Sequence, residues 1–164
     1  MNQQHLDYAT YTVWANKRLI DNLCPTDDSL LEKELVASFP TIRATILHIW
    51  LAETGWLSRL RGLGWEASNV TNFTGSNQEL FTAWQATSLA FQHFVESADL
   101  EKAIEFRHKG TSFSIPAREI VLTVCNHSSF HRGQIVMMMR QLGITEIAQT
   151  DYIEWVRLKA ANKP

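Results

Sequence analysis

Two histidines, His127 and His131, lie four residues apart in an apolar stretch of the chain. Residues with this spacing lie one above the other on one face of an α-helix, so both imidazoles can reach a single metal ion. A third histidine, His48, lies far upstream in another apolar segment. If the two segments form helices that pack together, three nitrogen ligands converge and one coordination position stays open.

The two histidines lie in the middle of the apolar face of their helix, not at its edge. At about 100° per residue, His131 and Gln134 fall within about 40° of His127, whereas Arg132 points the other way. Burying polar side chains without partners costs a few kcal/mol, and a metal ion supplies a partner for both histidines. The alternative is structural, because a core histidine can also bond a backbone carbonyl. Three histidines on the buried faces of two helices favour the metal.

Small residues flank His48 on its helix face. Ala44 and Gly55 lie beside it, and Arg59 lies further along the same face. The space they leave can hold a closely packed helix or a substrate next to the metal, and the sequence leaves both open. Gln134 and Arg59 are the residues that we expect to contact such a substrate.

The donor set indicates the chemistry. Three imidazoles bind Zn²⁺, Ni²⁺ or Fe²⁺, and three protein ligands with an open position are typical of catalytic sites. The metal can lower the pKa of a bound water or thiol. Ser128 stands where a metalloprotease His-Glu-x-x-His motif has its general base, and Glu53 projects about 140° away from His48. No catalytic base is assigned, which favours thiol chemistry over hydrolysis.

Hydrophobic periodicity predicts four long helices and one short closing helix, over about 3–24, 40–62, 76–98, 116–142 and 152–158. Ser76 and Glu79 form a capping-box pattern at the start of the third. Pro116 is expected in the first turn of the fourth, and Gly143 as its left-handed cap. We therefore expect an all-α fold, a four-helix bundle with a short C-terminal helix.

Two segments between the helices have other patterns. Alternating apolar residues between 103 and 115 predict a short hairpin between the third and fourth helices. The polar stretch 64–75 predicts a loop. The run 137–139 of three methionines indicates flexible core filling and not a cofactor site.

Composition places the chain among ordinary globular proteins. With 164 residues, of which 45% are hydrophobic and 20% charged, we expect one domain over 1–164. A net charge of −2 without a basic patch speaks against nucleic acid. The amino terminus does not have the pattern of a secretory signal, and no apolar run is long enough to predict a membrane span.

The cysteines indicate the cellular location of the protein, and the fourth helix indicates how the protein assembles. Cys24 and Cys125 lie in apolar segments, which predicts buried thiols and not a disulfide, as is typical of a cytoplasmic protein. Apolar residues surround the fourth helix on all sides. A homodimer contact along Val136, Met139 or the second helix would cover them.

Four segments of the chain resemble the DinB (damage-inducible) family of metal-binding four-helix bundles, and together they span nearly all of it. The matching segments are 11–19, 48–53, 126–134 and 151–153, of which Asn126–Gln134 is the most specific. The resemblance implies an up-down-down-up bundle, often dimeric, with His48, His127 and His131 as metal ligands. Related members include thiol-dependent transferases and isomerases that use bacillithiol, mycothiol or glutathione. The family name refers to induction by DNA damage and does not imply DNA binding.

Three functional hypotheses follow. The first is a metal-dependent enzyme, a thiol S-transferase or hydrolase, that activates a low-molecular-weight thiol or water for attack on a small electrophile. The second is a non-catalytic stress-response protein whose metal stabilises the bundle and whose fourth coordination position is blocked by a side chain. The third is a metal-free interaction module with satisfied core histidines.

Overall fold

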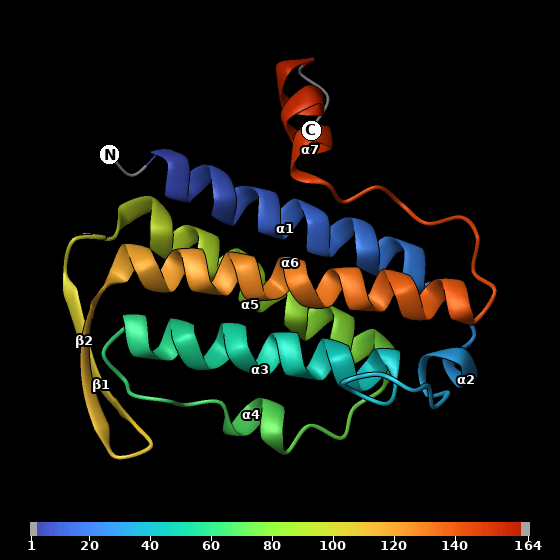
Figure 1. Ribbon diagram of the computed structural model, residues 1–164, viewed down its shortest axis with the longest axis horizontal. Coiled ribbons are helices and arrows are strands. Elements are labelled where there is room, and N and C mark those ends of the chain that lie inside the picture. The colour runs from blue at the N-terminus through green and yellow to red at the C-terminus, as the bar shows by residue number, and fades with distance from the viewer. Residues whose placement is uncertain (1–2, 162–164) are drawn as a thin grey trace.

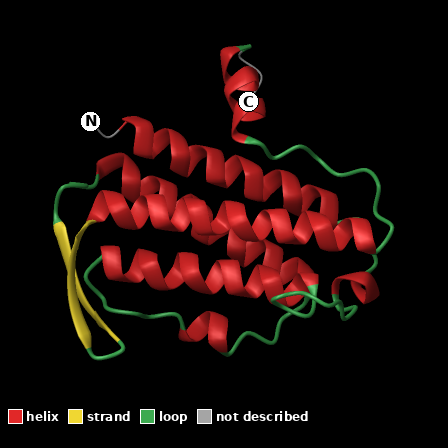
Figure 2. Cartoon of the chain, viewed as in Figure 1, coloured by secondary structure: helices red, strands yellow, loops and turns green. Residues whose placement is uncertain are grey.

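The structure is a computed structural model that describes residues 3–161. The described chain is mostly helical, with one small two-stranded sheet (Figure 2). Four long helices pack against one another, each of α1 and α3 contacting both α5 and α6 (Figure 1). These helices are α1 (Gln3–Leu23), α3 (Ile42–Leu60), α5 (Asn77–Ser97) and α6 (Ala117–Gln141). They confirm the four long helices predicted from periodicity, and the up-down-down-up order stays a prediction.

The ends of the long helices are capped by the side chains and turns that the sequence supplies. Thr41 caps α3, because its hydroxyl accepts a hydrogen bond from the Ala44 backbone N–H at 3.0 Å. The predicted capping box of Ser76 and Glu79 starts α5. Gly143 follows α6 with φ of +82°, a conformation that favours glycine. Pro116 is the N-cap residue of α6 and the last residue of β2, and so lies just before the first turn predicted for it.

The remaining elements are short. β1 (Ala103–His108) and β2 (Thr111–Pro116) form the predicted antiparallel hairpin at one end of the helices (Figure 1). α7 (Tyr152–Ala160) is the predicted closing helix and packs on α1. Two single-turn helices, α2 (Asp28–Leu31) and α4 (Ser68–Thr71), were not predicted, since four residues are too few to show a period. The segment 64–75, which was predicted to be a loop, therefore contains the short helix α4.

The core consists of two apolar clusters at different levels of the four helices. One includes Trp50 on α3, Trp84 on α5 and Ile135 on α6. The other includes Phe91 on α5 and Val124 on α6. Each long helix contributes to both clusters, and the polar residues between them lie at the level of the candidate site.

The burial of individual side chains tests the predictions for the cysteines and for the dimer contact. The two cysteines are free thiols, as predicted, but only Cys125 is buried and Cys24 is exposed. Met139 is fully buried inside the chain and cannot form the predicted dimer contact; the homodimer itself stays a prediction. Within residues 3–161, no helix combines the length and apolar character of a membrane span.

Candidate metal centre

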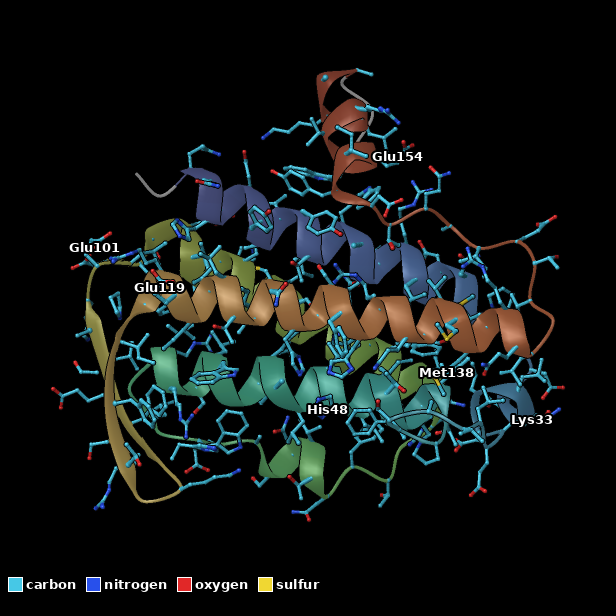
Figure 3. The ribbon with its side chains drawn as sticks, viewed as in Figure 1. Lys33, His48, Glu101, Glu119, Met138 and Glu154 are labelled. Carbon is cyan, nitrogen blue, oxygen red and sulfur yellow. The ribbon has the colours of Figure 1, made fainter. Side chains whose placement is uncertain are left out.

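Three histidine side chains from two packed helices meet in the structure. His48 projects from the middle of α3 (Figure 3), and His127 and His131 project from α6. Nε2 of His48 and Nε2 of His127 lie 3.0 Å apart, and the candidate ligand atoms all lie within 4.8 Å of one another. The three ring centroids are separated by 4.4 to 4.9 Å. The structure therefore brings together the three histidines that the sequence singled out.

Burial favours the neutral form of two of the three imidazoles. His131 is 6% exposed, and His48 and His127 are half-buried. Burial, helped by the neighbouring histidines, lowers the pKa of His127 to about 4 and also lowers the pKa of His48. At neutral pH both side chains keep a free nitrogen lone pair, which is the form that binds metals.

Gln134 orients His131. Its amide oxygen accepts a hydrogen bond from Nδ1 of His131 at 2.7 Å, which favours the tautomer that offers Nε2 to a metal. The Gln134 amide nitrogen lies 3.4 Å from the Ser38 hydroxyl. Metal-binding histidines typically donate a hydrogen bond from the ring nitrogen that does not bind the metal, and this bond fixes the tautomer. The predicted contact of Gln134 with substrate stays a prediction.

The donor set fits a divalent transition metal. Nε2 of His48 and Nε2 of His127 face each other, while the buried Nδ1 of His127 has no hydrogen-bond partner among the described residues. Two imidazoles that face each other in this way need a proton or a cation between them. Among residues 3–161, the cluster contains no carboxylate or thiolate. Three neutral nitrogen donors suit Zn²⁺, Ni²⁺ or Fe²⁺ better than Mg²⁺ or Ca²⁺.

A buried polar layer crosses the four long helices next to the histidines. It consists of Asn16, Glu53, Ser88, Ser128 and Arg132, each at most 2% exposed. The Glu53 carboxylate accepts hydrogen bonds from Asn16 Nδ2 (3.1 Å), Ser88 Oγ (2.8 Å) and Ser128 Oγ (2.8 Å). Burial raises the pKa of the Glu53 carboxyl, and these hydrogen bonds oppose that rise. One side chain thus ties α3 to α1, α5 and α6.

Arg132 is the cationic member of this polar layer. Its guanidinium donates hydrogen bonds to Asn16 Oδ1 (2.8 Å), Ser129 Oγ (2.8 Å) and Tyr11 Oη (3.3 Å). Asn16 therefore bridges the two buried charged side chains, Glu53 and Arg132. The sequence predicts that Arg132 points the other way from the two histidines, and the structure shows that this side of α6 is also buried, because the long side chain reaches the polar groups of α1.

The polar layer fixes the rotation of α6. Ser128 directly follows His127, and Arg132 directly follows His131. When Ser128 bonds Glu53 and Arg132 bonds Asn16, the preceding histidine in each case faces α3. We expect the layer to hold both histidines in the orientation that meets His48.

Aromatic rings flank the histidines on the outer side. The Phe39 ring stacks on His48 with centroids 4.2 Å apart and contacts the edge of His131 at 5.7 Å. Phe130, which is 63% exposed, makes an edge contact with His131 at 5.0 Å. Phe39 was not singled out in the sequence, since it lies in an irregular segment without a periodic pattern.

Arg59 lies apart from the histidines, about three helical turns or roughly 16 Å further along α3. Its guanidinium carbon lies 4.9, 4.7 and 4.5 Å from the ring centroids of Trp56, Trp65 and Phe106. The structure does not bring Arg59 to the cluster, and its contact with substrate stays a prediction.

The small residues beside His48 have different surroundings. A Cβ added at Gly55 would lie 2.4 Å from the Trp65 ring, so an aromatic side chain fills that space. Ala44 instead lines an open groove next to His48. Of the two alternatives that the sequence left open, space for a ligand is found on the Ala44 side, whereas Trp65 fills the Gly55 side.

Replacing Gln134 with alanine is expected to weaken Zn²⁺ binding about tenfold, because the hydrogen bond that orients His131 is lost. Competition with a fluorescent chelator measures the affinity. Gln134→Glu keeps an acceptor oxygen for Nδ1 and should bind like the wild type. Wild-type affinity in Gln134→Ala would contradict the orienting role.

Acidification is expected to destabilise the metal-free protein between about pH 6.5 and about pH 4, the ordinary and the lowered pKa of His127. In that window the unfolded chain takes up a proton on His127 that the folded chain does not bind, so protonation favours unfolding. Above pH 7 the imidazole is neutral in both states and the effect vanishes. Urea unfolding at pH 7 and pH 5 should show a smaller loss of stability for His127→Asn than for the wild type. An equal loss would contradict the lowered pKa.

Comparisons with known proteins show which proteins the chain resembles. The sequence matches the DinB family over residues 1–161, a range that includes all three histidines. It is 25% identical over 151 residues to Protein DinB of Bacillus subtilis (strain 168), covering 87% of each chain. The structure resembles the crystal structure of a DinB-like protein from Bacillus cereus ATCC 10987, with a TM-score of 0.67 and 26% identity. That alignment covers 85% of this chain and 91% of the other.

Proposed function

Since the chain belongs to the DinB family, we propose that it is a cytoplasmic metal-dependent enzyme whose metal ligands are His48, His127 and His131. The metal would be Zn²⁺, Ni²⁺ or Fe²⁺. The reaction would be attack of a low-molecular-weight thiol, or of water, on a small electrophile. The observation that carries this proposal is a cluster of three imidazoles that lacks a fourth histidine, cysteine or carboxylate ligand among residues 3–161.

The metal and the protein have separate roles. A divalent metal in this cluster would lower the pKa of a thiol or water that takes its open position, and so supply a nucleophile at neutral pH. The three histidines hold the ion, Gln134 orients His131, and the polar layer holds α6. Glu53 is fully engaged in that layer and does not face the cluster. The proton released by the nucleophile would therefore pass to solvent, which suits a thiol better than water because a thiol is the stronger acid.

The proposal is tested by turnover of the metal-loaded protein. Metal-free protein is loaded separately with Zn²⁺, Ni²⁺ or Fe²⁺ and assayed with bacillithiol, mycothiol and glutathione against 1-chloro-2,4-dinitrobenzene, and with small esters for hydrolysis. We expect metal-dependent consumption of a thiol that is absent in His131→Ala. Equal rates in the two proteins would contradict the proposal.

A second candidate is a metal-binding stress-response protein without catalysis. The position of Phe39 favours it, since a ring stacked 4.2 Å from His48 can block the open coordination position. In that case chelation should lower the melting temperature strongly, and no thiol should change the spectrum of the Co²⁺-loaded protein. Thiol turnover above background would exclude this candidate.

We also propose that the four long helices run up-down-down-up. Along α1 and α6, residues of the apolar cluster around Phe91 precede those of the cluster around Trp84. Along α3 and α5 the order is reversed. This order supports α1 and α6 running in one direction and α3 and α5 in the other.

A further inference from the structure

An open groove of about 300 Å³ lies against His48; we call it the His48 groove. His48 forms part of its wall, and Phe39 closes one side. The other walls are α3, α4 and the segment that follows α4, with the side chains of Ala44, Leu47, Leu51, Val70, Thr71 and Phe73. A ligand in the groove would therefore directly contact one of the proposed metal ligands.

The walls of the His48 groove are apolar and carry no charged side chain. Thr71 is the polar exception besides His48, and its hydroxyl donates a hydrogen bond to the Ala67 carbonyl at 3.2 Å. A ligand in the groove would meet methyl groups, methylenes and aromatic rings. Such walls favour an uncharged apolar group and disfavour a charged one, which would lose its water without gaining a partner.

Phe39 contacts both the groove and the histidine cluster. Its side chain is among the residues that line the groove, and its ring contacts the rings of His48 and His131. It belongs to the irregular segment 32–41 between α2 and α3, in which the Val36 side chain is fully exposed. The segment is held at Leu35, which bonds Pro40 through the backbone and packs on the core, and at Glu32, which pairs with Arg43. Nearer to Phe39, Ser38 makes only the long contact of 3.4 Å with Gln134. The ring of Phe39 is therefore the side chain of this segment that could control passage from the groove to the cluster.

We propose that the His48 groove binds the uncharged, apolar part of the substrate, and that Phe39 is the gate between this groove and the open coordination position of the metal. The inference rests on the proposed function, because it places a ligand at that position. It narrows the substrate to a compound with one reactive polar end and an apolar or aromatic body that fits about 300 Å³.

The first test uses two neutral probes that need no thiol chemistry. Imidazole and 1-benzylimidazole both offer a nitrogen to the metal, but only the second has an apolar group to fill the groove. Visible absorption of the Co²⁺-loaded protein reports their binding. We expect 1-benzylimidazole to bind about tenfold more tightly than imidazole. Equal affinities would overturn the inference.

A charged variant tests the groove itself. Ala44 lies in the first turn of α3, where an aspartate is compatible with helix formation, so Ala44→Asp should fold. It places a negative charge in the groove wall and should abolish the preference for 1-benzylimidazole. Gln78→Asp is the matched control, because Gln78 is an exposed first-turn residue of α5 that does not line the groove. An unchanged preference in Ala44→Asp would overturn the inference.

Two phenylalanine variants test the gate. Phe39→Ala should raise the association rate of both probes several-fold in stopped-flow absorption, because the ring no longer stacks on His48. Phe130→Ala removes the other ring in edge contact with His131 but leaves the groove intact, and should associate at the wild-type rate. A wild-type rate in Phe39→Ala, or equal acceleration in both variants, would overturn the gating role.

The outcomes separate this inference from the proposed reaction. A preference for 1-benzylimidazole without thiol transfer or hydrolysis would refute the reaction and support the groove. Turnover without that preference would support the reaction and refute the groove.

Discussion

Replacing His131 with alanine is expected to lower the affinity for a divalent metal by more than about a hundredfold. Loss of an outer-shell partner costs about 10- to 100-fold, and loss of one of three ligands should cost more. His131 is the most buried of the three and contacts the rings of both other histidines. Inductively coupled plasma mass spectrometry of the purified protein should show substoichiometric metal, and added Zn²⁺ should bind weakly.

His93→Ala is the matched control, because His93 is an exposed histidine on α5 and belongs to no candidate site. It should retain the wild-type metal content. Circular dichroism of the metal-free proteins separates lost coordination from lost fold, since both variants should remain helical. Full metal occupancy in folded His131→Ala would contradict the ligand assignment.

The second large effect is expected at Glu53, whose replacement with alanine should lower the free energy of unfolding by about 3–5 kcal/mol. Each buried donor that loses its acceptor costs about 1–3 kcal/mol. Asn16, Ser88 and Ser128 would all lose the Glu53 acceptor of their hydrogen bonds, and Asn16 is also the residue that Arg132 bonds. Urea unfolding of the metal-free protein measures the loss.

Glu53→Gln should cost less, about 1–2 kcal/mol, because an amide oxygen can still accept from Asn16 and Ser128. The amide nitrogen can donate to the Ser88 hydroxyl, which also reaches the Trp84 carbonyl at 3.1 Å. Glu96→Ala, an exposed change on α5, should stay within about 0.5 kcal/mol of the wild type. A Glu53→Ala protein as stable as Glu96→Ala would contradict the structural role of the polar layer.

The polar layer explains how a metal site can be held in an otherwise apolar core. Apolar contacts are non-directional, so four helices packed only through apolar side chains could slide or rotate against one another with little loss of stability. The hydrogen bonds of Glu53 and Arg132 are made at one register of the helices, and the same register brings His48 to His127 and His131. Stability of the metal-free protein and affinity for the metal should therefore fall together when this layer is disrupted.

The long helices and the three histidines could be predicted because both follow from short-range pattern. A period of 3.6 residues defines each helix, and a spacing of four places His127 and His131 on one face. His48 could be added because it lies in a second apolar helix.

The partners of Arg132 could not be predicted in the same way. A helical projection gives the direction of Arg132 from its own helix, but not the presence of Asn16 on a helix far away in the sequence. Asn16 was nevertheless a signal, since it is a polar residue in an apolar stripe. Ala44 was the signal for the His48 groove, since a small residue beside His48 leaves space. Phe39 had no signal, because irregular segments are positioned by tertiary contacts.

The central claim is that His48, His127 and His131 hold one divalent transition metal. It is tested most directly by elemental analysis of untagged protein purified without chelators, followed by calorimetric titration of the metal-free form with Zn²⁺, Ni²⁺ and Fe²⁺. We predict one bound ion per chain in the wild type and a loss of that ion in His131→Ala. A wild-type protein that contains no metal, and that binds none of the three ions at micromolar concentration, would contradict the claim.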